Sequence, residues 1–93
     1  MEFEFDSRKA AANAAKHGVS FEEAASVLRD ALSESGPDPA NSDREDRFLI
    51  VGLAGSGRLL VVAVTHRRDA IRIISARELT ARERRAYERQ RAP

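Results

Sequence analysis

The alternation of hydrophobic and polar residues divides the chain into strand-like and helix-like segments. The opening EFEF, residues 2–5, alternates with a period of two and predicts a short half-buried strand. Three later apolar runs, 47–53, 58–66 and 70–77, are separated only by AGSG and RRD. Connections this short require antiparallel hairpins. Because these runs are apolar on both faces, we expect a sheet that is covered on both sides, by helices or by a partner.

Two helices are predicted between the first strand and the hairpins. An alanine-rich segment that begins at Ser7 is stopped by Gly18, a residue type that often follows a helix end. Ser20 then opens the sequence SFEE, a capping box in which Ser20 and Glu23 each satisfy a free amide of the first turn. Over residues 21–32 the apolar side chains recur with helical spacing and form one core-facing stripe. They are Phe21, Ala24, Ala25, Leu28, Ala31 and Leu32.

The remaining segments are a long loop and a polar helix. Residues 33–46 are rich in Gly, Pro, Asn, Ser and acids without an apolar period, so we expect a mobile loop. Thr80 and Glu83 form a second capping box, which starts a helix over 81–90. Few of its residues can pack inward, which predicts a lid on the sheet edge or a handle for a partner. The order β-α-α-β-β-β-α indicates one α+β domain, residues 1–93, with a small antiparallel sheet packed by helices.

Composition limits the classes of function and the compartment. A chain of 93 residues suits one small domain of marginal stability. The chain has no cysteine, which excludes disulfides and Cys-based zinc sites. No apolar run approaches the ~20 residues of a membrane span, and the opening MEFEFD lacks the features of a signal peptide. We therefore expect a cytoplasmic protein that makes no contact with a membrane.

Charge is distributed unequally between the two halves of the chain. Residues 1–46 carry 11 acidic and 5 basic side chains, a balance of −6, whereas residues 47–93 carry 4 acidic and 11 basic, a balance of +7. Of the 16 basic residues, 14 are arginine, which suits bidentate contacts to phosphate. The second half is therefore expected to meet an anionic partner.

Common signatures of cofactor and metal chemistry are missing from the sequence. The glycines of AGSG join two apolar runs rather than open a helix, which favours a hairpin over a phosphate-binding loop. The two histidines lie 49 positions apart without cysteine, a weak pattern for a metal site. No G-x-S-x-G elbow marks a Ser-His-Asp triad. What remains is chemistry that needs neither metal nor cofactor, or no chemistry at all.

The stretch RIISAR, residues 72–77, places two arginines in an apolar strand. Strict alternation sends Arg72 and Arg77 to opposite faces, unless the strand twists or ends between them. A buried guanidinium keeps its charge and must find an anion or carbonyl groups. That anion is either internal, such as Glu45 or Asp46, or the phosphate of a bound nucleic acid.

Four further polar residues are candidates, each with a structural alternative. His66 shares a face with Arg58 by alternation, and it is either a proton carrier near neutral pH or a turn-edge histidine. His17 is expected to meet the C-terminal carbonyls of its helix rather than a substrate. Glu45 is a solvated loop acid or a general base. Tyr87 packs its ring on the sheet or offers its hydroxyl to a ligand.

Four segments follow one another along the chain: FDSRKAAANAAKHGVSFEEA, DREDRFLIVGL, GRLLVVAVTH and RIISARELTARERRAYE, at 5–24, 43–53, 57–66 and 72–88. In this order they resemble the BrnT family, toxins of bacterial type II toxin–antitoxin pairs. The resemblance spans nearly the whole chain, and the combination of KHGVSFEEA with RIISAR is specific. It implies a RelE/ParE-like α+β fold, a ribonuclease that halts translation, and a BrnA-like antitoxin. The DNA-binding, ribbon-helix-helix portion of that antitoxin would connect the complex to operator DNA.

The family pattern carries over to defined positions of this chain. KHG falls on Lys16, His17 and Gly18, the E-x-R-F-like run on Glu45, Arg47 and Phe48, RIISAR on Arg72 to Arg77, and the terminal E-R-x-x-Y on Glu83, Arg84 and Tyr87. Phe5 stands where the family pattern has a tryptophan. This departure keeps an aromatic ring but loses the indole N–H donor.

The chemistry that the resemblance implies needs no metal and no cofactor. The 2′-hydroxyl of the RNA attacks the adjacent phosphate and gives a 2′,3′-cyclic product, while the protein orients the backbone, moves protons and stabilises negative charge. We assign the phosphate to Arg72 and Arg77, and the base or acid to Glu45 or His66. Further RNA contacts are assigned to Lys16, Arg47, Arg58 and Tyr87.

Two alternatives from other classes stay open. A non-catalytic RNA- or DNA-binding module is consistent with the basic second half, although the chain has only five aromatic residues and no helix-turn-helix pattern. A pure interaction protein would use its arginine-rich surface to receive an acidic partner segment. RNA that is shifted but uncut would favour the first alternative, and co-purification with the product of the neighbouring gene would address the second.

Overall fold

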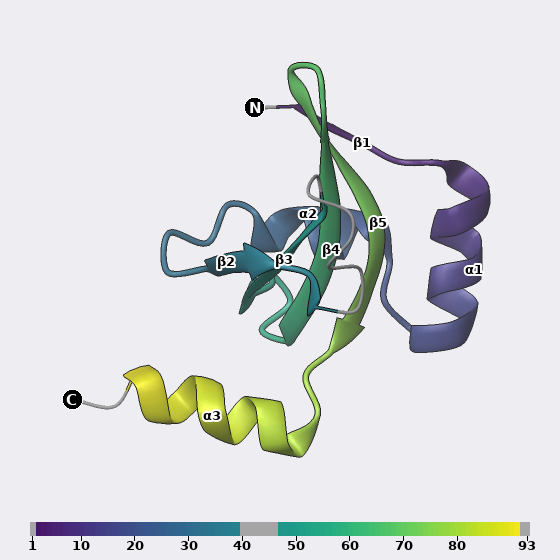
Figure 1. The fold of residues 1–93 in the computed structure, drawn as a ribbon. Helices are drawn as coiled ribbons and strands as arrows, with labels where there is room; N and C mark the ends of the chain where they lie inside the picture. The colour runs from purple at the N-terminus through teal and green to yellow at the C-terminus, as the bar shows by residue number, and fades with distance from the viewer. Residues whose placement is uncertain (1, 40–46, 92–93) are drawn as a thin grey trace.

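The computed structural model describes residues 2–39 and 47–91, which form a five-stranded sheet and three helices (Figure 1). In chain order the elements are β1 (Glu2–Glu4), α1 (Ser7–His17), α2 (Phe21–Val27), β2 (Glu34–Pro37), β3 (Arg47–Leu53), β4 (Leu59–Arg67), β5 (Ala70–Glu78) and α3 (Ala81–Arg91). The predicted α+β class is confirmed, with one strand more than the sequence indicated.

The strand order across the sheet is β1-β5-β4-β3-β2. β3, β4 and β5 form the two predicted antiparallel hairpins. β1 instead runs parallel to β5 and pairs only with residues 70–72. Among the described residues no strand pairs with the edge of β5 beyond that point, and α1 lies alongside it (Figure 1).

The additional strand, β2, lies inside the segment 33–46 that the sequence predicted to be a loop. Residues 34–37 pair antiparallel with β3, from Glu34 opposite Val51 to Pro37 opposite Phe48. The pairing rests on main-chain groups at a sheet edge, where an apolar period is unnecessary and proline is tolerated. The loop prediction is therefore wrong for 34–37, while residues 40–46 lie outside the described part of the chain.

The second helix is shorter than the periodicity predicted. α2 ends at Val27, and the chain turns at Asp30, whose carboxylate accepts hydrogen bonds from the backbone N–H of Leu32 and Leu53 at 2.9 and 2.8 Å. An aspartate that binds nearby backbone amides favours a turn over a continued helix. As a consequence Leu32 is 66% exposed, although the stripe predicted it in the core.

The main core lies between the sheet and the helices α1 and α2, on what we call the helix face of the sheet. Its buried residues are Val19, Phe21, Ala24, Val27, Ala54, Leu60, Val62, Val64, Ile71, Ile73 and Ala76. The opposite surface, here called the open face, carries a smaller cluster of Leu59, Val61 and Leu79 with Tyr87 of α3. α3 extends away from the end of β5 (Figure 1). Within residues 2–39 and 47–91, α1 and α2 cover the helix face, whereas α3 contacts the open face through Tyr87.

A β-bulge in β5 decides where the two arginines of RIISAR point. The pairing with β4 passes from Ala63 opposite Ser75 directly to Val64 opposite Ile73, which leaves Ile74 as an extra residue. Beyond the bulge the alternation is inverted, so Ala76 joins Ile73 in the core of the helix face. Arg72 and Arg77 therefore share the open face, and the prediction that alternation separates them is wrong.

Candidate functional site

A groove of about 470 Å³ occupies the middle of the open face. It collects residues from five elements and one loop, which are His17, Asp38, Pro39, Leu49, Val61, Ala63, Ser75, Ala76, Arg77 and Glu83. The floor is apolar, because Leu49, Val61 and Ala63 come from the strands β3 and β4. Polar and charged side chains form the walls, so a ligand would meet a flat apolar base and an ionic rim.

Arg77 and Glu83 form one wall of the groove. The guanidinium donates to both carboxylate oxygens of Glu83, at 2.7 and 3.0 Å, and to the backbone carbonyl of Glu78 at 3.1 Å. These hydrogen bonds from Arg77 lower the pKa of Glu83 to about 2, and the carboxylate in turn raises the pKa of Arg77. A bidentate pair of this kind holds the guanidinium in a fixed orientation.

The predicted capping box at the start of α3 explains why Glu83 is in place. Glu83 N–H donates to the Thr80 hydroxyl at 3.1 Å, and Thr80 N–H donates back to the Glu83 carboxylate at 2.9 Å. The same carboxylate thus caps α3 and binds Arg77. Because the box is local in sequence, it positions the ionic wall independently of the rest of α3.

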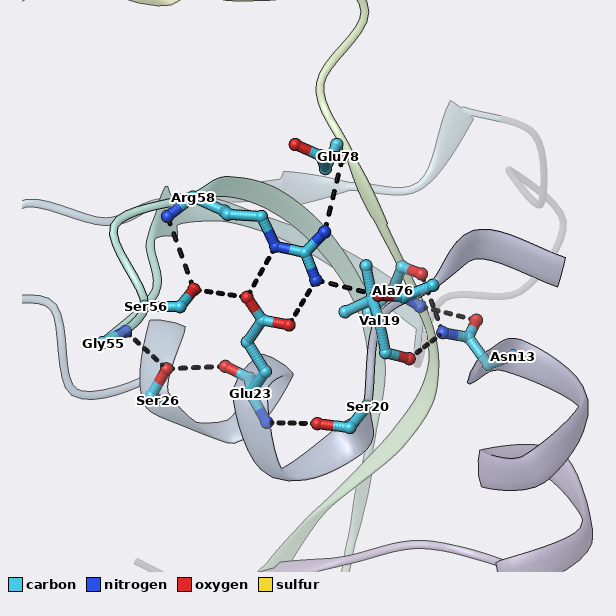
Figure 2. Close-up of polar contacts among 11 residues, drawn as sticks. Asn13, Val19, Ser20, Glu23, Ser26, Gly55, Ser56, Arg58, Ala76 and Glu78 are labelled. Atoms are coloured by element: carbon cyan, nitrogen blue, oxygen red, sulfur yellow. Dashed lines mark hydrogen bonds and ion pairs between the residues drawn. The ribbon is translucent and has the colours of Figure 1, made fainter. Parts of the chain in front are cut away.

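His17 forms another part of the rim, at the end of α1, where Gly18 adopts a left-handed φ of 68°. Buried Asn13 fixes this end of the helix: its amide donates to the carbonyls of Val19 and Ala76 at 2.9 and 2.8 Å, and accepts from Ala76 N–H at 3.0 Å (Figure 2). At this edge of β5, the Asn13 side chain thus makes the hydrogen bonds to the Ala76 backbone that a neighbouring strand would otherwise make. This anchor brings half-buried His17 to the groove that also contains Ser75.

Arg58 has a different environment from the one that the sequence predicted. Its Nε donates to the Glu23 carboxylate at 2.8 Å, its Nη2 donates to the other Glu23 oxygen and to the Gly18 carbonyl, and Glu78 lies 3.4 Å away (Figure 2). The hydrogen bonds from Arg58 lower the pKa of Glu23, whose carboxylate also accepts from Ser56. Arg58 therefore joins the β3–β4 turn to α2, which supports a structural role, while its assignment to RNA stays a prediction.

The first capping box is only half formed as a result. Ser20 accepts a hydrogen bond from Glu23 N–H at 3.0 Å, as predicted. The Glu23 carboxylate, however, turns to Arg58 instead of returning to the N–H of Ser20. An arginine offers two parallel hydrogen bonds between opposite charges, whereas the box would have made one bond from an uncharged N–H to the carboxylate.

Arg72 lies toward the other end of the open face from Arg77. Its Nε is 3.4 Å from a carboxylate oxygen of Glu4 in β1, and its side chain is 29% exposed. Across the strands Arg72 is opposite Thr65, which is itself opposite Arg47. Arg47 and Arg72 thus belong to one row on the open face. Because Arg72 turns toward β1 and Arg77 toward α3, the two arginines do not converge on one point.

The remaining predicted residues are distributed over other parts of the surface. His66 lies on the helix face, where its ring contacts Phe48 edge to face at 5.2 Å, and is therefore separated from the groove. Lys16 is exposed beside His17, at the edge of β5. Tyr87 packs against the small cluster of the open face, as its structural alternative proposed. Glu45 lies outside the described residues.

Sequence reasoning underrated three residues of the groove. His17 was expected to meet the carbonyls at the end of its helix, and the structure also places it in the groove. Ser75 was hidden by the bulge, because strict alternation assigned it to the face of Ile73. Glu83 was recognised as a cap, but its second bond to Arg77 depends on tertiary structure.

The described residues contain neither a metal-binding cluster nor a membrane-spanning helix. Within residues 2–39 and 47–91, no three His, Asp or Glu side chains gather in a way that would hold a metal ion. No helix in this described part is both long and apolar enough to span a bilayer. The groove is taken as the candidate site because it brings Arg77, Glu83 and His17 from three different elements to one cavity.

Comparison with known proteins assigns the family. The fold is similar to that in a 1.1 Å crystal structure of the Brucella abortus ribonuclease toxin, BrnT, with a TM-score of 0.68 and 23% sequence identity; the match covers 86% of this chain and 97% of that chain. No curated protein matches the sequence. Residues 5–83 match the family model described as the ribonuclease toxin, BrnT, of type II toxin–antitoxin systems. Because this match covers most of the chain, the protein belongs to the BrnT family of ribonuclease toxins.

Proposed function

We propose that the protein cuts RNA without a metal ion, thereby inhibits translation, and is neutralised by a BrnA-like antitoxin. The observation that carries this proposal is the groove on the open face, where Arg77, His17 and Glu83 meet. Cleavage through the 2′-hydroxyl needs a cation at the phosphate and groups that move protons. The groove combines both kinds of group in a protein of a ribonuclease family.

Arg77 holds the scissile phosphate in this proposal. Of the five N–H donors of a guanidinium, Glu83 and the Glu78 carbonyl engage three, so the group can face a phosphate while the ion pair persists. Glu83 then serves as a positioning residue that aims the guanidinium. A fixed donor directed at the charge that develops in the transition state contributes roughly 2.7–4 kcal/mol.

His17 carries protons in this proposal, in place of His66 on the opposite face. It takes the proton of the 2′-hydroxyl as O2′ bonds to phosphorus, and the P–O5′ bond breaks as the leaving O5′ receives a proton. The products are a 2′,3′-cyclic phosphate and a 5′-hydroxyl end, so no co-reactant is consumed. Glu45, predicted from the sequence, remains a candidate for the second proton-transfer group.

The antitoxin is proposed to act by competition at the same groove. Membership of a toxin–antitoxin family implies a neutralising partner and an RNA substrate. An acidic segment placed against Arg77 would exclude the phosphate, since both anions need the same donors. A ribbon-helix-helix portion of that partner would carry the complex to operator DNA, without direct contact between DNA and this chain.

The test is cleavage of end-labelled single-stranded RNA by the purified protein in the presence of EDTA. We expect cleavage with 2′,3′-cyclic phosphate and 5′-hydroxyl ends, and no cleavage at positions where 2′-O-methyl replaces the hydroxyl. Loss of activity in EDTA that Mg²⁺ restores would contradict the metal-free mechanism. A shifted but intact RNA would favour the non-catalytic binding module instead.

A further inference from the structure

A second hollow lies near the β1 end of the open face and is not used by the proposed reaction. Its volume is about 330 Å³, and its walls are Glu4, Arg67, Arg68 and Arg72. Three arginines and one glutamate give these walls a formal net charge of +2. A concave surface with this charge concentrates anions.

Glu4 does not cancel the charge of the arginines. Its carboxylate oxygen lies 3.4 Å from Nε of Arg72, and the two side chains are 43% and 29% exposed. An ion pair of this length and exposure is weak. Arg67 and Arg68 are both exposed at the end of the β4–β5 hairpin, next to this pair. The exposed guanidinium groups of Arg67 and Arg68 can therefore donate hydrogen bonds to an anion that enters the hollow.

The backbone of Arg68 gives a second, independent observation. Its φ of 57° is the only positive φ of a non-glycine residue in the described ranges 2–39 and 47–91. Arg68 opens a two-residue hairpin turn, a position where Gly or Asn adopts positive φ at lower cost. An arginine at a strained position beside two other arginines points to a use for its side chain.

We propose that this hollow binds a phosphodiester group of the same RNA strand whose scissile phosphate lies at Arg77. The inference rests on the proposed function, because it assumes RNA in the groove. Arg72 and Arg77 lie five positions apart in β5, which is about 16 Å at ~3.3 Å per residue. This separation corresponds to a few nucleotides. One RNA strand can therefore occupy the hollow and the groove together, with Arg72 and Arg77 bound to different phosphates.

The surface between the two places favours RNA over an acidic peptide. The row Arg47, Thr65 and Arg72 adjoins Ala63 and Ser75, whose small side chains leave the way to the groove open. A nucleic acid strand carries a negative charge at every nucleotide and can follow such a path in any register. A peptide would need carboxylates placed at matching intervals.

The experiment measures binding of a 2′-O-methyl single-stranded RNA of about ten nucleotides, which suits typical single-strand site sizes and cannot be cut through its 2′-oxygen. Fluorescence anisotropy gives the Kd of the wild type, Arg68→Gly, the double variant Arg67→Gln with Arg68→Gly, and the control Arg29→Gln. Arg29 is exposed on the helix side, where its guanidinium lies 6.0 Å from the Phe3 ring. The titration is repeated over a range of salt concentrations.

We expect Arg68→Gly to raise or keep the melting temperature, because glycine relieves the positive φ, and yet to weaken binding. The double variant should raise Kd about tenfold and reduce the slope of log K against log salt by about 0.7, the value for the one phosphate contact that is lost. Arg29→Gln should bind as the wild type does. Because Arg68→Gly is expected to lose affinity without losing stability, misfolding cannot imitate the expected result.

An unchanged Kd and salt slope in the double variant would overturn the inference. The inference would also fail if the double variant bound RNA normally but a co-expressed antitoxin no longer neutralised it. The hollow would then serve a protein partner. The proposed function fails separately, if the wild type leaves unmodified RNA uncut. Because the binding titration uses RNA that cannot be cleaved, it decides the role of the hollow in either case.

Discussion

Replacement of Asn13 by alanine tests the link between the fold and the groove. The side chain is 6% exposed and makes three hydrogen bonds, to the Val19 carbonyl and to both backbone groups of Ala76. At about 1 kcal/mol for each buried bond, Asn13→Ala loses ~3 kcal/mol. Alanine returns about 0.6 kcal/mol through its higher helix propensity. The net loss in the free energy of unfolding is therefore about 2–3 kcal/mol.

For a domain of this size, that loss lowers the melting temperature by roughly 10–20 °C. Thermal unfolding followed by circular dichroism measures it, and Gln90→Ala, at an exposed residue of α3, is the matched control for removal of an amide from a helix. Because Ala76 stands between Ser75 and Arg77, we also expect RNA cleavage to fall at temperatures where Asn13→Ala is still folded. A decrease of less than about 3 °C would refute the role of Asn13 as a substitute strand at the edge of β5.

Asn13→Asp separates the hydrogen bonds from the size of the side chain. A carboxylate keeps the acceptor for Ala76 N–H but opposes the carbonyls of Val19 and Ala76, which favours its neutral form. The folded-state pKa of the new aspartate is then raised above its unfolded value. Its penalty is therefore present at neutral pH and decreases as the pH falls toward that of an ordinary carboxyl group. A pH-independent difference from the wild type would contradict this reasoning.

Two other predictions concern stability. Gly52→Ala would place a Cβ 2.9 Å from Cβ of Ser33 and 3.0 Å from an Asp30 oxygen. We therefore expect the free energy of unfolding, measured with denaturant, to fall by roughly 1–3 kcal/mol. Gly36→Ala, whose Cβ would have nothing within 4 Å, should be neutral or stabilising. Equal effects of both alanines would contradict the close approach at Gly52. Glu83→Gln should cost about 1 kcal/mol above pH 4.5, after discounting for an ion pair whose side chains are each 40% exposed. The pKa of Glu83 in the folded protein is about 2, below its usual 4.5. The stability difference between Glu83→Gln and the wild type should therefore disappear as the pH falls from 4.5 to 2. A difference that persists at pH 2 would count against the Arg77–Glu83 ion pair.

The sequence predicted the elements well where a local rule governs them. Gly18 ends α1, Ser20 and Thr80 cap the next helices, and the short turns produce the β3–β4 and β4–β5 hairpins. Each of these features depends on interactions between residues only a few positions apart. The prediction failed for β2, whose pairing depends on the exposed edge of β3 rather than on its own side chains.

The candidate site was harder to predict because it depends on long-range contacts. The bulge at Ile74 follows from the pairing of β5 with β4, and it alone brings Arg72 and Arg77 to one face. Likewise, only the fold shows that Glu23 occupies Arg58 and that Asn13 carries His17 to the groove. Residue type identified the arginines as important, but it did not distinguish the structural arginine from the one in the groove.

The most direct test of the account compares two arginines, Arg77→Ala and Arg58→Ala, in one RNA cleavage assay. Arg77 lies in the groove, and we expect its loss to reduce the cleavage rate on the order of 10²–10³-fold while circular dichroism shows a folded protein. Arg58 binds Glu23 and the Gly18 carbonyl, so its loss should lower the melting temperature but leave the cleavage rate of the folded protein close to that of the wild type. The account is contradicted if Arg77→Ala cuts RNA at the wild-type rate, or if Arg58→Ala remains as stable as the wild type and loses cleavage instead.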